Sequence, residues 1–318
     1  VFNAVNKHFS DIDSFFNVNK SPNYNYVYDQ IVSMGEILST TILSHYFSFK
    51  GIENNWVDVR NLIKTDTTYR DAVVDWKETE TLISTSINQN ILNITQGFLG
   101  SDPNYFTTTL GREGSDYTAA IFAYCLNAES VTIWKDVPGV LNADPRYFED
   151  TTLLNQISYR EAIELAFYGA SVIHPKTLQP LQNKEIPLYV KSFINPLLAG
   201  TSVSKGADLE PATSCFIVKK EQKLISLSSK DFSFIMEDNI SEIFGHLSQF
   251  KIKVSLIQNT AISFTICVED KFEKTAELTA ILNEKFNVEV TENVSLYTIR
   301  HFSDQAIAKV EAGKKVLV

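Results

Sequence analysis

Residues 107–126 read TTTLGREGSDYTAAIFAYCL, so a threonine run and a turn with two glycines lead directly into an apolar segment. The apolar side chains of that segment recur at helical spacing, at Ala119, Phe122, Ala123 and Leu126, which predicts a helix that begins at the turn. Free backbone N–H groups and a partial positive charge at this end of a helix favour a bound phosphate or carboxylate. Arg112 can fork onto such an anion, and Asp116 can orient a cation or an amine. Taken alone, the turn is more often a plain helix cap than a ligand site.

The composition is that of a globular protein long enough for two domains, with 318 residues, 44% of them hydrophobic and 21% charged. The net charge of −10 argues against binding nucleic acid through a basic surface. The three cysteines, Cys125, Cys215 and Cys267, are widely spaced, which excludes a disulfide framework or a paired-cysteine metal site and favours a reducing, cytoplasmic location. No apolar run approaches the length of a membrane helix, so we expect no membrane segment.

Helix and strand signals alternate over residues 1–207. Helical periodicity is expected over about 1–20, 26–49 and 75–89, from 116 onward, and over 158–169, where Ser158 and Glu161 fit a capping box. Strand patterns occupy 55–59, 91–98, 130–134 and 186–190. Such alternation is typical of an α/β sheet covered by helices on both faces, with ligands bound at the carboxyl ends of its strands.

The pattern changes between residues 200 and 211, and we place a domain boundary at about 207, giving domains 1–207 and 208–318. Beyond the boundary, strands are expected at 214–218, 224–227, 254–257, 262–268 and 288–299, with helices at 240–250 and 273–285. This order predicts a small α+β domain of the split βαβ, or ferredoxin-like, type.

Several motifs occur in an order that is more specific than any single turn. They are Gly35–Thr40, Gln96–Gly100, Thr107–Tyr117, Ile133–Val140, Asp144–Arg146, Tyr168–Pro175 and Ala199–Thr201. With these blocks the chain resembles aspartate kinase of the amino-acid kinase superfamily, followed by ACT regulatory modules. The resemblance implies a carbamate-kinase-like α/β/α sandwich over 1–207 and an α+β ACT domain over 208–318. It also implies ATP-dependent phosphorylation of the β-carboxylate of L-aspartate, the first step toward lysine, threonine and methionine.

The resemblance assigns roles to individual residues. Arg112 and Asp116 are implied as catalytic, and Glu36, Arg112 and Ser115 as holding the aspartate, with the acid of Glu36 against its ammonium group. ATP, with Mg²⁺, is implied to contact Lys135, Asp136, Leu141, Arg146 and Ser171. Without the family context, Glu36 would be a solvated helix residue, and Asp136 and Arg146 would be ordinary turn residues. His174, before Pro175, is interpreted as structural, because a carboxylate acceptor needs no general base.

The sequence also departs from the family pattern. The Lys-Phe-Gly-Gly-Thr/Ser loop that cradles the transferred phosphate does not occur, so we expect that roughly the first hundred residues of a typical member are missing and that the chain is part of a longer protein. Lys135 replaces a usual threonine and Ser171 a frequent lysine, which suggests that a positive charge has moved between these positions. Glu113 replaces a common glycine and adds negative charge beside the aspartate site.

Residues 232–260 resemble the effector-binding part of an ACT domain, and residues 294–318 begin a further module that is incomplete. The implied effector contacts are Ser233, Met236, Asn239, Ile240, Val254, Ser255, Asn259 and Thr260. Lysine-inhibited relatives carry carboxylates near the positions of Ser255 and Ala261, which are uncharged here, so threonine or no effector is also open beside lysine. A homodimer or higher homo-oligomer through the ACT domains is implied.

Two other functions are also compatible with the sequence. Another amino-acid kinase, such as one acting on glutamate, is disfavoured by the block at 107–117 and by the ACT segment. A non-catalytic amino-acid-sensing subunit, or a degenerate kinase, is favoured by the absent phosphate loop and disfavoured by the number of matched substrate residues.

Overall fold

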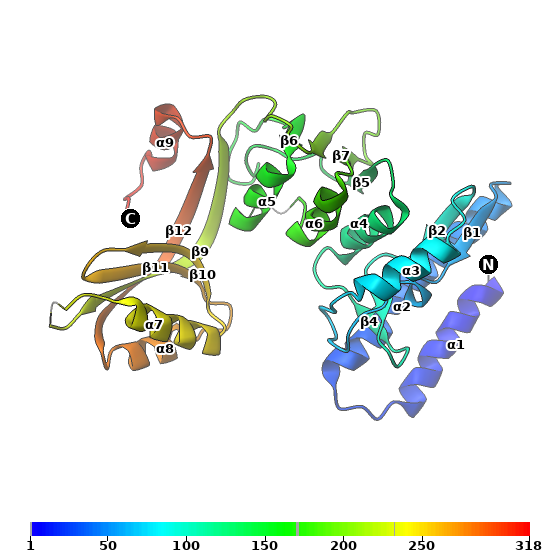
Figure 1. Cartoon of the computed structure of the whole chain (residues 1–318), viewed down its shortest axis with the longest axis horizontal. Helices are drawn as coiled ribbons and strands as arrows, with labels where there is room; N and C mark the ends of the chain where they lie inside the picture. Colours follow the sequence, from blue (N-terminus) through cyan, green and yellow to red (C-terminus); the bar gives the residue numbers. More distant parts are fainter. Residues whose placement is uncertain (1, 170–171, 232) are drawn as a thin grey trace. The chain divides into compact units, whose positions relative to one another are not determined.

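The computed structural model describes residues 2–169, 172–231 and 233–318 (Figure 1). The chain forms two compact units, and each is described by itself. The first comprises residues 1–140, 153–166 and 171–212, and the second residues 141–152, 167–170 and 213–318. Among the described residues, no helix combines the length and apolar character needed to cross a membrane.

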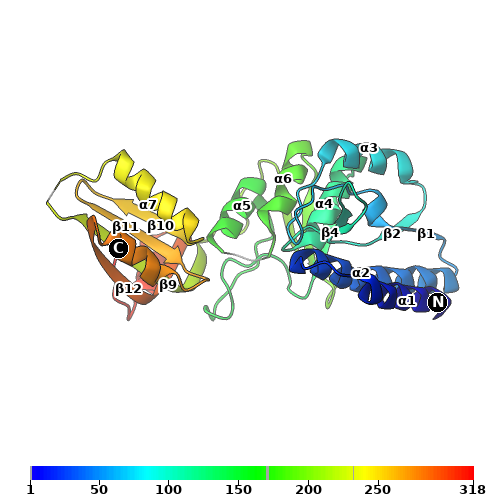
Figure 2. The ribbon, with the colours of Figure 1, turned by 90° about the horizontal axis from the view of Figure 1, so that it is seen from below.

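The first unit contains the expected mixture of helices and strands. Its helices are α1 (Phe2–Val18), α2 (Tyr24–Phe49), η1 (Val59–Asn61), α3 (Trp76–Ser86), α4 (Gly114–Leu126), α5 (Tyr159–Tyr168, whose last two residues fall in the second unit) and α6 (Pro175–Lys184). Side chains fix several helix starts: Asn23 caps α2, Asp75 caps α3, and Ser158 accepts the Glu161 N–H as the capping box predicts. In Figure 2, α1 and α2 lie along one another.

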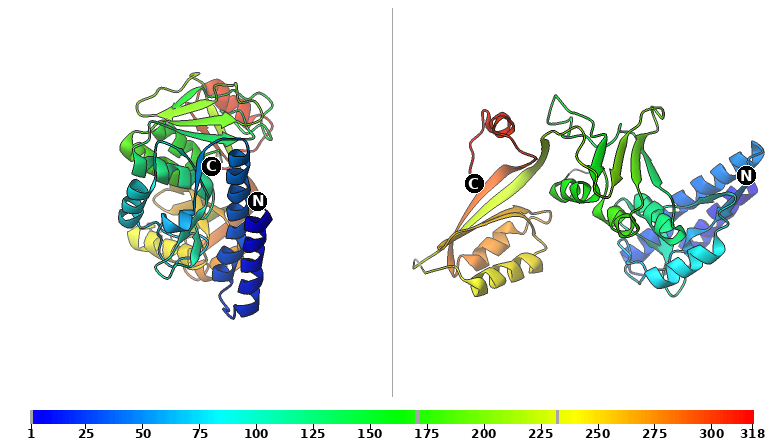
Figure 3. Two further views of the ribbon diagram at one scale, coloured as in Figure 1. Left: turned by 90° about the vertical axis from the view of Figure 1, so that its right-hand side faces the viewer. Right: turned by 45° about the horizontal axis from the view of Figure 1, so that its top comes forward.

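The strands of the first unit form three small sheets. They are β1 (Asn54–Val57) with β2 (Leu92–Thr95), β3 (Leu99–Ser101) with β4 (Thr107–Thr109), and a four-stranded sheet of order β5-β7-β8-β6. The last sheet joins β5 (Val131–Lys135), β6 (Gln156–Ser158), β7 (Leu188–Ser192) and β8 (Thr201–Ser204), and is green in Figure 3. We expected one sheet and did not expect β3, β4, β6 and β8. These strands have three and four residues, too few to establish a periodic pattern.

A buried carboxylate ties α2 to the strand that leads into the glycine turn. Asp29 is fully buried and accepts hydrogen bonds from the backbone N–H and hydroxyl of Thr109 and from the Arg70 N–H, each at 2.9 Å. Burial raises the pKa of Asp29 although these hydrogen bonds oppose the rise. The contact fixes the end of β4 and the loop around residue 70 with respect to α2.

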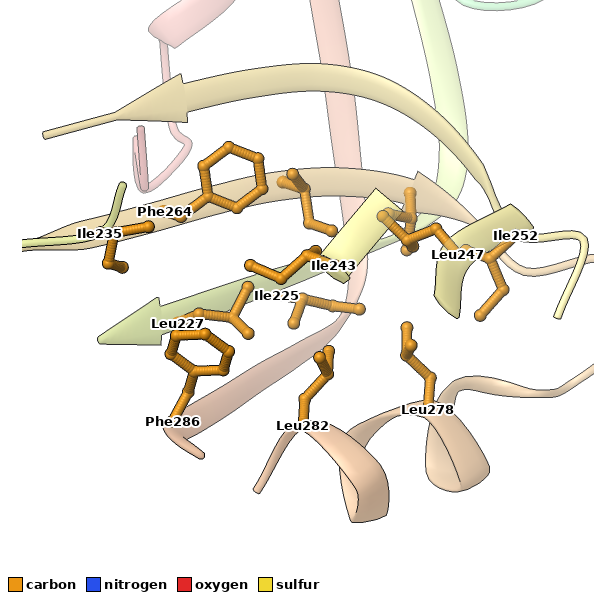
Figure 4. Close-up of a cluster of buried hydrophobic side chains, with 12 residues drawn as sticks. Ile225, Leu227, Ile235, Ile243, Leu247, Ile252, Phe264, Leu278, Leu282 and Phe286 are labelled. Carbon is orange, nitrogen blue, oxygen red and sulfur yellow. The ribbon is translucent and has the colours of Figure 1, made fainter. Parts of the chain in front are cut away.

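The second unit is an α+β fold with the predicted βαββαβ order. Its elements are β9 (Cys215–Ser229), α7 (Glu237–Gln249), β10 (Lys253–Asn259), β11 (Ser263–Glu269), α8 (Thr275–Leu282), β12 (Phe286–Arg300) and α9 (Asp304–Glu311). The antiparallel sheet has the order β10-β11-β9-β12. Figure 4 shows its apolar core, in which Leu278 and Leu282 of α8 and Leu247 of α7 face Ile225 and Leu227 of β9.

Residues 214–218 and 224–227 are not separate strands, as the sequence suggested. They belong to the single 15-residue strand β9, which remains paired with β12 through irregular register near Gln222 and Val294. The polar run at 219–223 that suggested a break is accommodated by this bulged pairing. The compact units meet between residues 212 and 213. The domain boundary at about 207 stays a prediction.

The start of α8 generates a prediction about pH. The Asp270 side chain is 1% exposed and accepts hydrogen bonds from Thr275 and from the Lys274 N–H, with Lys223 Nζ 3.2 Å away. Burial alone would raise its pKa, but these donors outweigh burial and lower the pKa to about 2. A lowered pKa in the folded state stabilises the protein above the unfolded value, and this contribution, roughly 2 kcal/mol, disappears as pH falls through the folded value.

We therefore expect the parent protein to lose this stability between about pH 4 and pH 2, and Asp270→Asn to show a flatter dependence in that window. Urea unfolding followed by circular dichroism at a series of pH values measures the slope. Asp238→Asn, an exposed carboxylate in the first turn of α7, is the matched control. Equal slopes for Asp270→Asn and the parent would contradict the assignment.

Candidate active site

The glycine-rich turn predicted from the sequence opens α4, but no side chain caps that helix. The N-cap position is Glu113, which has left-handed backbone angles (φ 54°, ψ 33°) and makes no capping hydrogen bond. Gly111 also has positive φ (81°), and a Cβ there would lie 2.5 Å from Asp71 Oδ1. The turn is therefore not the plain side-chain cap that its composition favoured, and the Gly114 N–H donates to the Gly111 carbonyl within it.

Packing of the loop after β2 positions the first turn of α4. A Cβ on Gly97 would lie 2.7 Å from both Cβ and Oγ of Ser115, so only glycine allows this approach. The neighbouring Gln96 is fully buried; its Oε1 accepts the Val59 N–H, and its Nε2 donates to Thr40 Oγ1 of α2. The motifs at 96–100 and 107–117 therefore lie together in the structure.

Glu36 lies on α2 one turn before Thr40, whose hydroxyl donates to the Glu36 backbone oxygen at 2.9 Å. Burial raises the pKa of the Glu36 carboxyl. Through Thr40 and Gln96, α2 is thus connected to the loop that packs on Ser115. Among the described residues, no hydrogen bond or ion pair joins Glu36 directly to Arg112, which is exposed.

An ion pair joins α4 to the end of β5. Lys135 Nζ lies 2.8 Å from Asp116 Oδ2, and the two side chains are only 21% and 17% exposed. Apart from this cation, the Asp116 oxygen is buried and accepts no aligned hydrogen bond within the part of the chain that the structure describes. The structure therefore brings together Asp116, predicted on the substrate side, and Lys135, predicted on the nucleotide side.

Further charges gather around His174, the N-cap residue of α6. His174 Nδ1 accepts the Lys176 N–H at 3.2 Å, so the neutral ring carries its proton on Nε2. Burial lowers the pKa of His174, and the charges of Glu113, Lys176, Arg112 and Asp71 act on it in opposing directions. Its capping contact agrees with the structural role predicted for it.

Two of the charges around His174, those of Lys176 and Asp71, form an ion pair with each other. Sequence reasoning missed both residues. Lys176 directly follows the His-Pro motif, whereas Asp71 is distant in sequence and carries no pattern of its own.

The other predicted nucleotide contacts are Asp136, Leu141, Arg146 and Ser171. Asp136 is exposed and directly follows β5. Leu141 and Arg146 fall in the second unit, where Arg146 is 75% exposed and pairs with Asp144 at 2.6 Å. Ser171 lies outside the described residues. The contribution of these four residues to nucleotide binding stays a prediction.

The predicted effector residues occupy the start of α7 and the edge strand β10. Asn239 Oδ1 accepts the Met236 N–H, with Ile240 partly buried beside it, and the Ser233 N–H donates to Asp231 Oδ1 at 3.0 Å. Val254 packs against the core, Ser255 occupies a bulge, and Asn259 and Thr260 are exposed at the end of β10. Sequence reasoning missed Lys219, whose Nζ donates to Ser255 Oγ at 3.3 Å.

The described residues contain no group of three or more His, Cys, Asp or Glu side chains that could hold a metal ion by themselves. A divalent ion that binds together with a nucleotide takes hard oxygen ligands. The Asp116 carboxylate has the hard oxygen donors that such an ion prefers.

Comparisons with known proteins identify similar chains. A family model described as the amino acid kinase family matches residues 3–192. The lysine-sensitive aspartokinase 3 of Escherichia coli is 34% identical over 244 residues, which are 76% of this chain and 54% of that protein. The chain therefore spans about half the length of this relative.

Two solved structures of aspartokinase III from E. coli share the fold. The complex with lysine and aspartate (T-state) has a TM-score of 0.78 at 31% identity, and the complex with aspartate and ADP (R-state) has 0.76 at 30%. In each case the match covers 93% of this chain and 68% of the other. The predicted amino-acid kinase fold is confirmed.

The conformation of Glu113 generates a prediction about stability. A non-glycine residue in the left-handed region costs about 1–2 kcal/mol, and Glu113 also buries Oε2 without a hydrogen-bond partner among the described residues. Glu113→Gly should raise the free energy of unfolding by about 1 kcal/mol, because both costs exceed the greater flexibility of glycine in the unfolded chain.

Urea unfolding measures this change, and Glu113→Ala separates the two causes, because alanine removes the carboxylate but keeps the backbone strain. We expect alanine to gain less stability than glycine. A destabilised Glu113→Gly variant would show that the carboxylate makes a favourable interaction instead.

Proposed function

This chain belongs to the amino acid kinase family, and we propose that it transfers the γ-phosphoryl group of ATP to the β-carboxylate of L-aspartate. The similarity to aspartokinases supports this reaction. The charges that the reaction requires also occur together in one site, which supports the same reaction. A purely amino-acid-sensing subunit is the alternative.

The observation that carries the proposal is the ion pair between Lys135 and Asp116. A carboxylate acceptor needs no base, so catalysis depends on alignment of the reactants and neutralisation of the phosphate charge. The Lys135 cation lies at the carboxyl end of β5, and the Asp116 carboxylate lies at the N-terminus of α4. An acceptor and a γ-phosphate that approach each other there would find both alignment and charge neutralisation.

We assign the substrate side as follows. Arg112, exposed beside the turn, binds a carboxylate of aspartate bidentately, and Glu36 receives its ammonium group. Ser115, held against Gly97, lies next to the reacting carboxylate. The partial positive charge at the N-terminus of α4 adds positive potential for the anionic substrate.

On the nucleotide side, Lys135 exchanges its contact with Asp116 for the transferred phosphate, which frees the Asp116 carboxylate. Mg²⁺ bound with ATP neutralises phosphate charge, and Asp116 is the protein group that fits it. Asp136, Leu141, Arg146 and Ser171 complete the proposed nucleotide contacts. The positive charge of Lys135 would replace that of the lysine that the family more often has at the position of Ser171.

We further propose that the second unit regulates the enzyme by binding an amino acid through the α7 start and β10. The E. coli relative was solved with lysine. Here Ser255 and Ala261 are uncharged and Lys219 adds a cation beside Ser255, so a neutral effector such as threonine is favoured over lysine. Homodimerisation through this unit and a cytoplasmic location belong to the same proposal.

The function is tested by incubating the full chain with ATP, Mg²⁺, L-aspartate and hydroxylamine. Aspartyl phosphate reacts with hydroxylamine to give a hydroxamate whose ferric complex is coloured, so an aspartate-dependent signal is expected, with none when glutamate replaces aspartate. Absence of hydroxamate, together with a melting temperature that rises with an added amino acid, would favour the sensing subunit instead.

The proposed role of Lys135 gives a sharper prediction. Lys135→Ala should raise the Michaelis constant for ATP about 10- to 100-fold, the effect of losing a charge-assisted contact, with a smaller change for aspartate. Lys191→Ala, which removes a lysine from β7 in the same sheet, is the control. An unchanged Michaelis constant for ATP in Lys135→Ala would eliminate the assigned role.

A further inference from the structure

The loop that carries two of the proposed nucleotide contacts, Leu141 and Arg146, belongs to the second unit. It comprises residues 141–152, which follow β5, precede β6 and lie outside every helix and strand that the structure describes. A segment of this kind has no helix or sheet ladder of its own to pair its backbone groups, so other contacts must fix its conformation.

Asn142 joins the two ends of this loop. Its side-chain Oδ1 accepts the Thr152 N–H at 2.7 Å, and its backbone N–H donates to the Thr152 carbonyl at 2.9 Å. Asn142 is only 6% exposed. Leaving its buried partners without a hydrogen bond would be costly, and this cost keeps the loop closed.

The same asparagine ties the loop to the start of β9. Its Nδ2 donates to the Ser214 carbonyl at 3.0 Å, and its backbone carbonyl accepts the Phe216 N–H at 2.7 Å. The next residue, Ala143, forms an isolated parallel bridge with Phe216, which pairs with Ile299 of β12 on its other side. The loop is therefore hydrogen-bonded to the edge of β9 that lies opposite β12.

A short turn presents Arg146 within the loop. The Asp144 carboxylate accepts the Arg146 N–H at 2.8 Å, and the Asp144 carbonyl accepts the N–H groups of Tyr147 and Phe148, each at 3.0 Å. The centroid of the Phe148 ring lies 5.3 Å from that of Phe216. The turn is therefore fixed to β9 on both sides, by the preceding hydrogen bonds and by the Phe148 ring, while the Arg146 side chain is exposed.

We infer that Asn142 is a positioning residue for nucleotide binding, which holds the Asp144–Phe148 turn so that Arg146 meets a phosphate group of ATP. This role rests on the proposed kinase function. Arginine binds phosphate through a planar fork, and a fork held in one orientation loses less entropy on binding. A turn released from β9 samples other conformations, and the apparent dissociation constant rises as the competent fraction falls.

Isothermal titration of the full chain with the ATP analogue AMP-PNP and Mg²⁺ measures nucleotide affinity without turnover. Asn142→Ala removes both side-chain hydrogen bonds and should raise the dissociation constant about tenfold, or 1.4 kcal/mol. It should also raise the Michaelis constant for ATP and leave that for aspartate nearly unchanged. Asn155→Ala is the matched control, because Asn155 is exposed and lies three residues beyond the loop.

The Phe148 ring provides a second pair of variants. Phe148→Leu should weaken nucleotide binding in the same direction, whereas Phe148→Tyr keeps the ring and should retain the parental affinity. Circular dichroism checks that each variant folds, and the Phe148 variants carry the test if Asn142→Ala does not fold.

A double-mutant cycle with Arg146→Ala separates positioning from a general loss of structure. If Asn142 acts through Arg146, Asn142→Ala should change the affinity by no more than about twofold in the Arg146→Ala background. A tenfold change in that background, or unchanged affinity in either Asn142→Ala or Arg146→Ala, would overturn the inference.

Failure of the proposed function has a different signature. A parent chain that binds AMP-PNP but forms no hydroxamate would overturn the kinase reaction and leave the positioning role of Asn142 intact. A parent chain that binds no nucleotide would overturn both.

Discussion

The site depends on one buried carboxylate that is remote from the chemistry. Asp29 of α2 holds the backbone and hydroxyl of Thr109 and the backbone of Arg70. Thr109 is two residues before Gly111, and Arg70 precedes Asp71, against which Gly111 packs. A buried carboxylate must satisfy its oxygens, so these donors have little freedom to move. The position of the turn at the start of α4 is therefore set from α2.

The charge of the site follows from that placement. With α4 fixed, Asp116 meets Lys135 in a pair that is mostly shielded from water. Removing either partner would leave an uncompensated charge, which costs more than an exposed pair gains. Under the proposed reaction, an incoming phosphate supplies the replacement anion for Lys135, so the pair would open only when its charge is compensated. The same arrangement keeps the carboxylate ordered before a nucleotide binds.

The sequence predicted those parts of the structure that are encoded locally. The periodic helices α2 and α4 and the alternating strand β11 have their signals within one segment. Strands as short as β6 contain too few residues for a pattern, and β9 was divided by a polar run that its partner β12 tolerates. In the site, the ordered motifs predicted Asp116 and Lys135. Asp29, Asp71 and Lys176 act through contacts between residues far apart in the chain, which periodicity cannot predict.

Eleven non-glycine residues of the described chain have positive φ, and three of them lie in loops around the start of α4. Arg70, Phe98 and Glu113 have positive φ without being glycine. Arg70 is held by Asp29, a Cβ on Gly114 would lie 2.6 Å from the Phe98 ring, and Glu113 opens α4. Such conformations persist only where surrounding contacts enforce them, and they concentrate at functional sites. The contacts that impose them are those that place Ser115 and Asp116, so the strain is a consequence of building the site.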